Sequence, residues 1–263
     1  MNILPKKSLG QNFLIDENIL NIIADLGRIN NEDLVIEVGP GTGNLTEKIL
    51  KKSPKEFTVI EKDKRLAEFL KKKFENKINI INDDILNFSY ENSLKKNIII
   101  YGNLPYNIST QILSKWIKIR KLHNFCKKFI LMFQKEVADR IIAEVNSKNY
   151  SRLSIISNWK LNIKKIMDIN PKSFNPIPKV KSTILTLEPK KNIYKLQDGK
   201  NLEHITNVFF NQKRKMIKKP MKVLFKNYEE ISKELSLDLN LRPQNLSNLT
   251  YYKICSIYEK SIK

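Results

Sequence analysis

Residues 34–43 read Leu-Val-Ile-Glu-Val-Gly-Pro-Gly-Thr-Gly, and this stretch decides the fold class. Leu34–Val38 has the apolar composition of a strand buried on both faces, and a helical pattern, Leu45–Leu50, follows the closely spaced glycines. A strand that enters a helix through a glycine-rich turn is typical of an open α/β sheet, which binds ligands at the carboxyl ends of its strands. The turn therefore predicts an α/β fold and the place of its ligand.

The same alternation of strand and helix continues to about residue 132. Further β-rich runs lie at Phe57–Ile60, Ile78–Ile81, Ile98–Tyr101 and Phe129–Phe133. Helical patterns occupy Glu17–Leu26, with Asp16 as its expected N-cap, Leu66–Phe74 and Ile108–Ile119. Nearly continuous apolar strands separated by helices predict a mostly parallel sheet covered on both faces.

The remainder of the chain has a different pattern. After a helix at Val137–Val145, three segments are expected to be extended and to form an antiparallel edge of the same sheet: Leu153–Trp159, Leu161–Ile169 and Ser182–Leu187. Beyond Pro189 the pattern is purely helical, at Leu202–Phe210, Met216–Phe225, Tyr228–Leu235 and Tyr251–Ile262. We therefore predict an α/β domain over residues 1–189 and a small all-helical domain over residues 190–263.

The chain is strongly basic. Its 263 residues include 48 Lys and Arg against 27 Asp and Glu, a formal net charge of +21. The excess is denser in residues 171–263, which hold 19 basic and 8 acidic side chains. This balance predicts a polyanionic partner, because Lys and Arg displace counterions from phosphates. A lysine-rich codon bias that only solvates the surface is the alternative explanation.

Cysteine content and hydropathy exclude several classes of protein. Cys126 and Cys255 are too few for a disulfide framework or a four-ligand zinc site, and we expect both to be buried apolar residues. No run approaches the roughly 18 apolar residues of a membrane span. We therefore expect a cytoplasmic protein with no metal and no membrane association.

Three successive strand ends carry residues suited to an adenosine-containing ligand. The glycines of the first turn, Gly39, Gly41 and Gly43, have a G-x-G-x-G spacing, whereas dinucleotide folds use G-x-G-x-x-G. Glu61 ends the second strand and is placed to accept both hydroxyls of a ribose. Asp84 follows the third strand, where it is placed to accept from an adenine amine, with Ile85 against the ring. Each feature alone is more often a turn or a solvated cap; the series predicts S-adenosylmethionine rather than NAD.

The fourth strand runs into Gly102-Asn103-Leu104-Pro105-Tyr106. A planar amine such as adenine N6 is a poor nucleophile, and an amide oxygen from Asn103 with the carbonyl of Leu104 would accept its two N–H groups and free its lone pair. Pro105 fixes the turn, and Tyr106 offers a face for base stacking. An Asn-Pro turn is usually only a turn, but this one follows a predicted methyl-donor site. No strong base is required, so we expect His123 and His204 to lie on the surface.

These residues resemble the ribosomal RNA small-subunit adenine N6,N6-dimethyltransferases, which modify two adjacent adenines near the 3′ end of small-subunit (16S) ribosomal RNA. The similarity covers nearly the whole chain, through Ser8–Leu14, Glu37–Thr46, Asn103–Ser109, Gln134–Ala138, Tyr150–Ser154, Phe174–Ser182, Phe209–Met216 and Arg242–Ser247. The last two segments favour this family over the antibiotic-resistance methyltransferases of large-subunit RNA. Lys213, Met216 and Ile85 depart from the family's usual residues, and Ile85 would alter the packing of adenine.

The resemblance implies a class I methyltransferase fold, with a Rossmann-like sheet and a helical RNA-binding domain. It implies S-adenosylmethionine contacts from Gln11, Asn12, Leu14, Gly39, Gly41, Gly43, Glu61, Lys62, Asp84, Ile85 and Asn103. The implied catalytic set is Asn103, Leu104, Pro105, Tyr106 and Phe174, with Tyr106 and Phe174 on either side of the flipped adenine. The implied RNA contacts are Lys179, Lys213, Arg214, Lys215, Lys218 and Lys219, although a solvated helix face would look similar.

The expected partners are small-subunit ribosomal RNA and the assembling small subunit, bound by a monomer. Two other functions fit the same residues. The amide-and-aromatic turn also serves N6 methylation of adenine in DNA, and the fold also suits a non-catalytic assembly or transcription factor.

Overall fold

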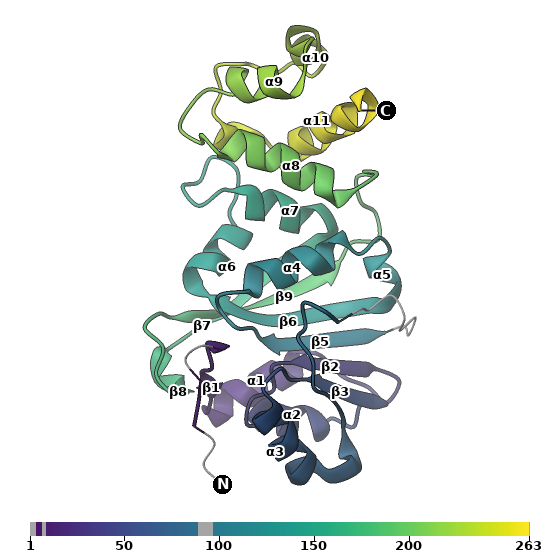
Figure 1. Ribbon diagram of the computed structural model, residues 1–263, viewed down its shortest axis with the longest axis vertical. Coiled ribbons are helices and arrows are strands. Elements are labelled where there is room, and N and C mark those ends of the chain that lie inside the picture. Colours follow the sequence, from purple (N-terminus) through teal and green to yellow (C-terminus); the bar gives the residue numbers. More distant parts are fainter. Residues whose placement is uncertain (1–3, 7–8, 89–96, 263) are drawn as a thin grey trace. The chain divides into compact units, whose positions relative to one another are not determined.

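The computed structural model describes residues 4–6, 9–88 and 97–262, so Ser8 of the N-terminal motif lies outside the described residues. The chain divides into two compact units (Figure 1). The first unit comprises residues 1–115, 120–138 and 162–189, and the second comprises residues 116–119, 139–161 and 190–263. The second unit thus includes two segments from the interior of the chain, in addition to the residues beyond the predicted domain boundary at residue 189.

A seven-stranded sheet belongs, except for its residue Leu161, to the first unit. In spatial order its strands are β4 (Asn79–Ile81), β3 (Glu56–Ile60), β2 (Leu34–Val38), β5 (Ile98–Asn103), β6 (Cys126–Gln134), β9 (Ser182–Pro189) and β7 (Leu161–Ile169). The strands from β4 to β6 are parallel, and β9 pairs antiparallel with β6. The predicted mostly parallel sheet with an antiparallel edge is confirmed. Because β2 is flanked by β3 and β5, the strand order reverses at β2, where open sheets bind ligands.

The helices of this part of the chain begin close to their predicted positions, except for the short helix at Leu122–Phe125, which was not predicted. They are α1 (Glu17–Leu26), α2 (Asn44–Leu50), α3 (Lys64–Phe74), α4 (Ser109–Lys118), α5 (Leu122–Phe125) and α6 (Lys135–Ile141). The last residues of α4 and α6, from Trp116 and from Asp139 onward, belong to the second unit. Short 3₁₀ turns, η2 (Glu75–Lys77) and η3 (Pro171–Ser173), and the two-residue strands β1 (Phe13–Leu14) and β8 (Phe174–Asn175) also belong to the first unit. Asp16 caps α1 as predicted, because its carboxylate accepts from the backbone N–H groups of Asn18 and Ile19.

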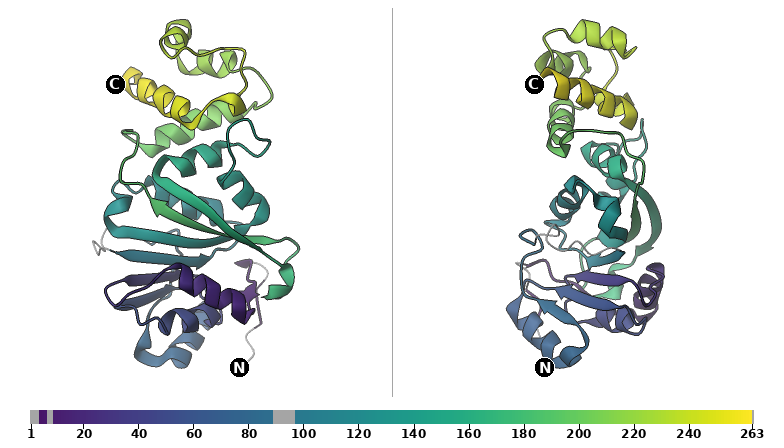
Figure 2. Two further views of the ribbon diagram at one scale, coloured as in Figure 1. Left: turned by 180° about the vertical axis from the view of Figure 1, so that it is seen from behind. Right: turned by 90° about the vertical axis from the view of Figure 1, so that its right-hand side faces the viewer.

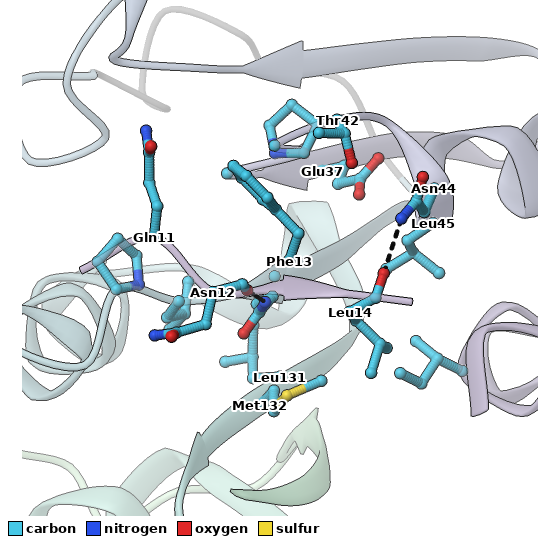
Figure 3. A pocket seen from close by; sticks show the side chains of 18 of the residues that line it. Gln11, Asn12, Phe13, Leu14, Glu37, Thr42, Asn44, Leu45, Leu131 and Met132 are labelled. Carbon is cyan, nitrogen blue, oxygen red and sulfur yellow. Dashed lines mark hydrogen bonds between the residues drawn. The ribbon is translucent and has the colours of Figure 1, made fainter. Parts of the chain in front are cut away.

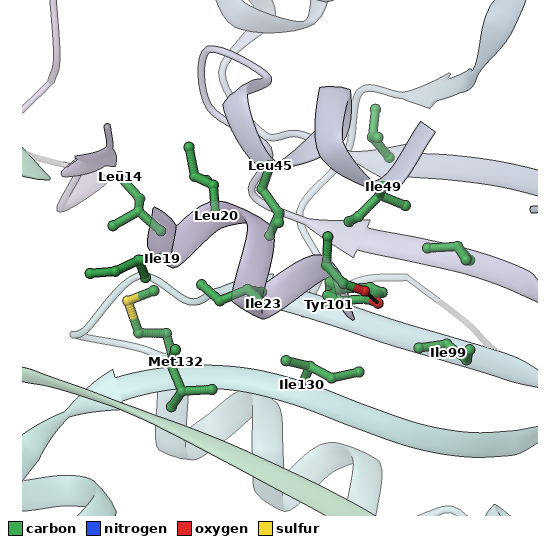
Figure 4. Packing of buried hydrophobic residues seen from close by; sticks show 14 of the residues in the cluster. Leu14, Ile19, Leu20, Ile23, Leu45, Ile49, Ile99, Tyr101, Ile130 and Met132 are labelled. Carbon is green, nitrogen blue, oxygen red and sulfur yellow. Dashed lines mark hydrogen bonds between the residues drawn. The ribbon is translucent and has the colours of Figure 1, made fainter. Parts of the chain in front are cut away.

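An apolar core lies on one face of the sheet, against α1 and α2 (Figure 4). Alternate residues of neighbouring strands point into it, including Ile99 and Tyr101 of β5 and Ile130 of β6. The Tyr101 hydroxyl is satisfied inside the core, because it donates to the carbonyl of Ala24 at 2.9 Å. The same alternation bears on the site, because Glu37 lies two residues after the core residue Val35 on β2 and therefore points to the same face of the sheet.

The segment Arg152–Lys160 is helix α7, so the expectation of an extended segment at Leu153–Trp159 is wrong. The helix begins with a capping box, in which the Ser154 hydroxyl accepts from the backbone N–H of Ser151 at 3.0 Å. Residues from Ser154 to Lys160 are buried on most sides of the helix. A helix buried all round lacks the 3.6-residue polar–apolar period that would have identified it.

The second unit is helical, as predicted for the end of the chain. Besides α7 it contains α8 (Gly199–Phe210), α9 (Lys218–Leu224), α10 (Tyr228–Glu234), η4 (Pro243–Asn245) and α11 (Asn248–Ser261). Phe209 packs edge-on against Tyr251 with ring centroids 5.3 Å apart, which joins α8 to α11. Ile205 and Phe209 are buried, as are both cysteines, whereas His123 and His204 are exposed. The predicted burial of the two cysteines and the predicted surface positions of the two histidines are confirmed.

Candidate functional site

The segment Gly10–Leu14, here called the strap, lies across the carboxyl end of the sheet and is held by side chains from three elements. Gln11 donates through Nε2 to Oδ2 of Asp63 at 3.1 Å, in the loop after β3. The carbonyl of Asn12 accepts from Nδ2 of Asn103 at 2.9 Å, at the end of β5. The carbonyl of Leu14 accepts from Nδ2 of Asn44 at 2.8 Å, the contact dashed in Figure 3. The strap is therefore fixed along its length.

The far end of the strap is held by main-chain pairing. β1 pairs antiparallel with β8, with Phe13 opposite Asn175 and Leu14 opposite Phe174 (Figure 1). The next residue, Ile15, donates its backbone N–H to the carbonyl of Ser173 at 2.9 Å. Phe174 is 1% exposed and belongs to the apolar core. The ring of Phe174 is thus covered by the core, whereas the predicted stacking against a target base needs an accessible face.

The glycine turn after β2 has positive φ at Gly39, Gly41 and Gly43, a conformation that side chains disfavour. Two of these glycines also leave space for a neighbouring side chain. A Cβ on Gly41 would lie 2.7 Å from Cδ1 of Phe13 in the strap. A Cβ on Gly43 would lie 2.6 Å from Cε2 of Phe74 in α3. The lack of a side chain at Gly41 thus leaves space for Phe13 of the strap, and the lack of one at Gly43 lets α3 pack against the turn.

A pocket opens between the strap, the glycine turn and the ends of β5 and β6 (Figure 3). Of the predicted donor-binding and catalytic residues, its lining includes Gln11, Asn12, Leu14, Gly39, Gly41, Glu61, Asn103, Leu104, Pro105 and Tyr106. Among the described residues, the lining does not include the other predicted ones: Gly43, Lys62, Asp84, Ile85 and Phe174. The charged side chains among the described lining residues are Glu37 and Glu61, and none is Lys, Arg or His. In a chain of net charge +21 this pocket is selectively acidic.

Both carboxyl groups of the pocket are buried. Glu37 is 2% exposed, and its Oε2 accepts from the Thr46 hydroxyl at 2.6 Å. Burial raises the pKa of Glu37 to about 8. Burial also raises the pKa of Glu61, although its Oε1 accepts from the backbone N–H of Asp63 at 2.8 Å. A cationic ligand would favour the ionised form of both groups, and an anionic ligand would oppose it.

The turn after β5 presents an amide and an aromatic ring to the same pocket. Because Nδ2 of Asn103 is used by the Asn12 carbonyl, its Oδ1 is the end left to accept from a ligand. The Tyr106 hydroxyl lies 2.6 Å from Oγ of Ser182, at the start of β9, and this contact fixes the ring. The carbonyl of Pro105 accepts from the backbone N–H of Ile108 at 3.1 Å, which closes the turn.

The residues at the end of β4 form a neighbouring cluster. Lys62 Nζ lies 2.7 Å from Oδ2 of Asp84, and the backbone N–H of Leu86 donates to Oδ1 at 2.9 Å. The hydrogen bond from Lys62 lowers the pKa of the Asp84 carboxyl. Each carboxylate oxygen therefore has one donor and keeps a second lone pair that could accept from an adenine amine. Ile85 beside it is buried.

The predicted RNA-binding residues are exposed. Lys213, Arg214 and Lys215 follow α8 and border a small hollow that also includes Phe210–Gln212. Lys218 and Lys219 begin α9, so these five basic residues lie on one short stretch of the second unit. Lys179 is exposed on the first unit.

A family model described as ribosomal RNA adenine dimethylase matches residues 3–261. The chain belongs to this dimethylase family. A relative named "Ribosomal RNA small subunit methyltransferase A", from Pelagibacter ubique, is 54% identical over 98% of this chain and 98% of its own. A protein of the same name from Ehrlichia canis is 39% identical over 97% of each chain.

Two solved structures are similar to this chain. A dimethyladenosine transferase from Plasmodium falciparum has a TM-score of 0.79 and 28% identity, with coverage of 94% of this chain and 98% of that one. The 23S rRNA methyltransferase ErmE has a TM-score of 0.69 at 20% identity, with coverage of 94% and 99%, and this likeness shows the fold alone. The chain is a methyltransferase of class I, with the Rossmann-like sheet described above.

Several residues that organise this dimethylase site were not identified from the sequence as site residues. They are Phe13, Asn44, Thr46 and Asp63, which act on the strap, on Glu37 or on Gln11. Asp63 is 3% exposed and also accepts from Arg65. Its place two residues after a strand-end acid, as the N-cap of α3, is a usable sequence signal. Phe13, Asn44 and Thr46 act through tertiary contacts, which a local sequence pattern does not predict.

Within the described ranges, no set of three His, Cys, Asp or Glu side chains is placed to hold a metal ion. Among the described helices, none combines the length and the apolar character needed to cross a membrane.

Proposed function

We propose that this chain transfers methyl groups from S-adenosylmethionine to the N6 amines of two adjacent adenines near the 3′ end of 16S ribosomal RNA. The observation that carries the proposal is the acidic pocket beside the Asn103–Tyr106 turn, in an otherwise strongly basic chain. The names and close similarity of the relatives support the same reaction class and the same RNA.

The donor set of the pocket fits S-adenosylmethionine, which carries a sulfonium and an ammonium cation. Glu37 and Glu61 would both be stabilised as carboxylates by such a ligand, whereas a pyrophosphate would meet two buried acids. Gly39 and Gly41 let the ligand approach the backbone. In this proposal Gln11, Asn12, Leu14, Glu61 and Asn103 also hold the donor. When bound, S-adenosylmethionine supplies an electrophilic methyl group.

Lys62 follows the lining residue Glu61, and Asp84 and Ile85 follow the neighbouring strand β4; we assign all three to the adenine end of the donor. The ion pair from Lys62 Nζ, at 2.7 Å, would hold the Asp84 carboxylate in place for that contact. Gly43 serves the donor indirectly, because it lets α3 pack behind the turn.

The turn Asn103–Tyr106 activates the acceptor. Asn103 Oδ1 and the Leu104 carbonyl accept the two N–H groups of the target amine, which favours a pyramidal nitrogen with a free lone pair. Pro105 holds the turn, and the ring of Tyr106, fixed by Ser182, supports the base by stacking. Phe174, covered in the core, supports the strap by pairing with Leu14.

The target base must leave its stack to reach this turn, which costs a few kcal/mol and least in a loop. A hairpin loop of ribosomal RNA is therefore the favoured substrate, presented by the assembling small subunit. Lys179 on the first unit and the basic stretch Lys213–Lys219 on the second unit would each bind phosphates of the RNA.

The test uses the full chain, radiolabelled S-adenosylmethionine and a synthetic RNA hairpin with two adjacent loop adenines. Primer extension across the loop is expected to stop at the dimethylated adenines, and Asn103→Ala is the inactive control. A DNA hairpin of the same sequence is run in parallel. Transfer to DNA alone would overturn the RNA assignment, and wild-type protein that neither binds the donor nor transfers methyl groups would overturn the enzyme assignment.

A further inference from the structure

The segment 176–181, here called the wedge segment, exposes large apolar side chains. It joins β8 to β9 at the margin of the first unit (Figure 2, left). Ile177 is 66% exposed and Val180 is 43% exposed, while Pro178 between them is buried and anchors the segment. Exposed isoleucine and valine in a short anchored loop point to a contact with a partner.

Both ends of the wedge segment are attached to the walls of the pocket. On one side, Asn175 pairs with Phe13 of the strap. On the other side, Oγ of Ser182 lies 2.6 Å from the Tyr106 hydroxyl, and Ile184 lines the pocket itself. The wedge segment therefore bridges the strap and the proposed base-stacking ring, and it adjoins the place where the target adenine must enter.

Charge identifies the kind of partner. Lys179 and Lys181 are exposed within the wedge segment, and Lys172 is exposed a few residues before it. Apolar side chains flanked by lysines match a nucleic acid, in which bases offer apolar faces and phosphates offer negative charge. RNA is the polyanion of the proposed reaction, so this surface and the active site would face the same molecule.

Extrusion of the target adenine leaves a gap between its neighbours, and loss of stacking at that gap opposes extrusion. Proteins that kink nucleic acids fill such gaps with Ile, Leu, Met or Phe side chains. We propose that Ile177 and Val180 insert beside the bases that flank the target adenine and replace its stacking, while Lys179 binds the adjoining phosphate. This inference rests on the proposed function, because it requires an RNA adenine as substrate.

The experiment compares the double variant Ile177→Ala/Val180→Ala with wild type on two RNAs. One is the hairpin, and the other is a short unstructured RNA with the same adenine pair, which has little stacking to replace. The ratio of the methylation rates, hairpin over unstructured, is expected to fall by roughly tenfold in the variant. Ile22→Ala, an exposed isoleucine of α1, is the matched control and is expected to keep the wild-type ratio.

A second readout does not depend on methyl transfer. With 2-aminopurine at the target position of the hairpin, binding of wild type is expected to raise the fluorescence as the base unstacks, and the double variant is expected to raise it less at saturation. Thermal unfolding of both proteins should coincide, because the two side chains are exposed.

The inference would be overturned if the double variant kept the wild-type ratio of methylation rates and raised the fluorescence as much as wild type does. It would also be overturned if the variant lost the same methylation rate on both RNAs. If wild type methylates the hairpin without a fluorescence change, the proposed insertion of Ile177 and Val180 is wrong, although the proposed function stands. If wild type methylates neither RNA, the proposed function itself fails.

Discussion

The side-chain amide of Asn103 donates to the backbone carbonyl of Asn12 at 2.9 Å, so the strap decides which end of that amide faces the pocket. An amide has one donor end and one acceptor end, and here the donor end is already used. The amide oxygen, Oδ1, is therefore the end that faces the acceptor site. The segment that closes the donor pocket therefore also orients the group that activates the acceptor.

Asn103→Asp is expected to lower the methyl-transfer rate by about 10²–10³-fold at saturating donor. A carboxylate cannot donate to the Asn12 carbonyl, and two oxygens facing each other would repel and displace the strap. Single-turnover transfer to the RNA hairpin measures the effect, with Asn124→Ala, an exposed amide of α5, as the control. A rate within twofold of wild type would contradict the assigned role of Asn103.

The hydrogen bonds that hold the strap are expected to contribute to the affinity for S-adenosylmethionine. Asn44→Ala removes one hydrogen bond to the strap, and Gln11→Ala removes two, to Asp63 and from the backbone N–H of Lys6. At about 1 kcal/mol for each bond, donor affinity is expected to fall about fivefold in Asn44→Ala and at least as much in Gln11→Ala. Isothermal titration of S-adenosylmethionine into each variant measures this loss. Asn18→Ala on the exposed side of α1 is the control, and unchanged affinity in both strap variants would show that the strap does not hold the donor.

The sheet was predictable because each of its strands is a short apolar run followed by a turn or a helix. The helix α7 was not, because its buried residues show no polar–apolar period. At the site, Glu61 and Asn103 could be predicted because each stands at or directly after the end of a strand, and both line the pocket. The burial of Phe174 could not be predicted, because the short strand to which it belongs pairs only with β1, which is distant in sequence.

The two glycines Gly41 and Gly43 are expected to fail in different ways when replaced by alanine. In Gly43→Ala the new Cβ would lie 2.6 Å from Phe74 and 2.8 Å from Leu70, within the packed α3, at a φ of +79°. We expect a loss of about 2–4 kcal/mol in the free energy of unfolding, measured by urea titration. In Gly41→Ala the Cβ meets the ring of Phe13 in the strap.

For Gly41→Ala we therefore expect donor affinity to fall at least tenfold, because displacement of Phe13 loosens the strap, with a smaller loss of stability than in Gly43→Ala. Comparable stability losses in the two variants, with equal donor affinity, would contradict this division of roles. Each variant serves as the control for the other.

The buried carboxyl of Glu37 predicts how stability depends on pH in the absence of the donor. Burial raises its pKa from 4.5 to about 8, against opposing effects of the Thr46 hydrogen bond and of Lys73, and Glu61 raises it further. Between these two values the folded state binds one more proton than the unfolded state. Stability must therefore fall as the pH rises, by about 2 kcal/mol between about pH 6 and about pH 8.

Glu37→Gln is the matched variant, because an amide resembles the protonated acid and its oxygen still accepts from Thr46. Urea titrations of donor-free protein across this pH range are expected to show a flatter profile for the variant than for wild type. Parallel profiles would mean that Glu37 is ionised in the folded protein at neutral pH.

The basic stretch after α8 predicts a salt dependence of RNA binding. Each lysine or arginine that neutralises a phosphate of single-stranded RNA contributes about 0.7 to the slope of log K against log salt concentration. Replacement of Lys213, Arg214 and Lys215 by alanine is therefore expected to weaken binding of the hairpin and to lower the slope by up to about 2. Fluorescence anisotropy between low and physiological salt measures both quantities.

The control must remove the same charge from another exposed surface of the second unit. Lys233, Lys253 and Lys260 meet this requirement, since they lie on α10 and α11 and are exposed. Their triple alanine variant has the same net charge as the first, so general electrostatic attraction falls equally in both. If the two variants lose the same affinity and slope, the basic excess acts as a diffuse charge, as codon bias would produce. A larger loss from Lys213, Arg214 and Lys215 locates a phosphate-binding surface at that stretch.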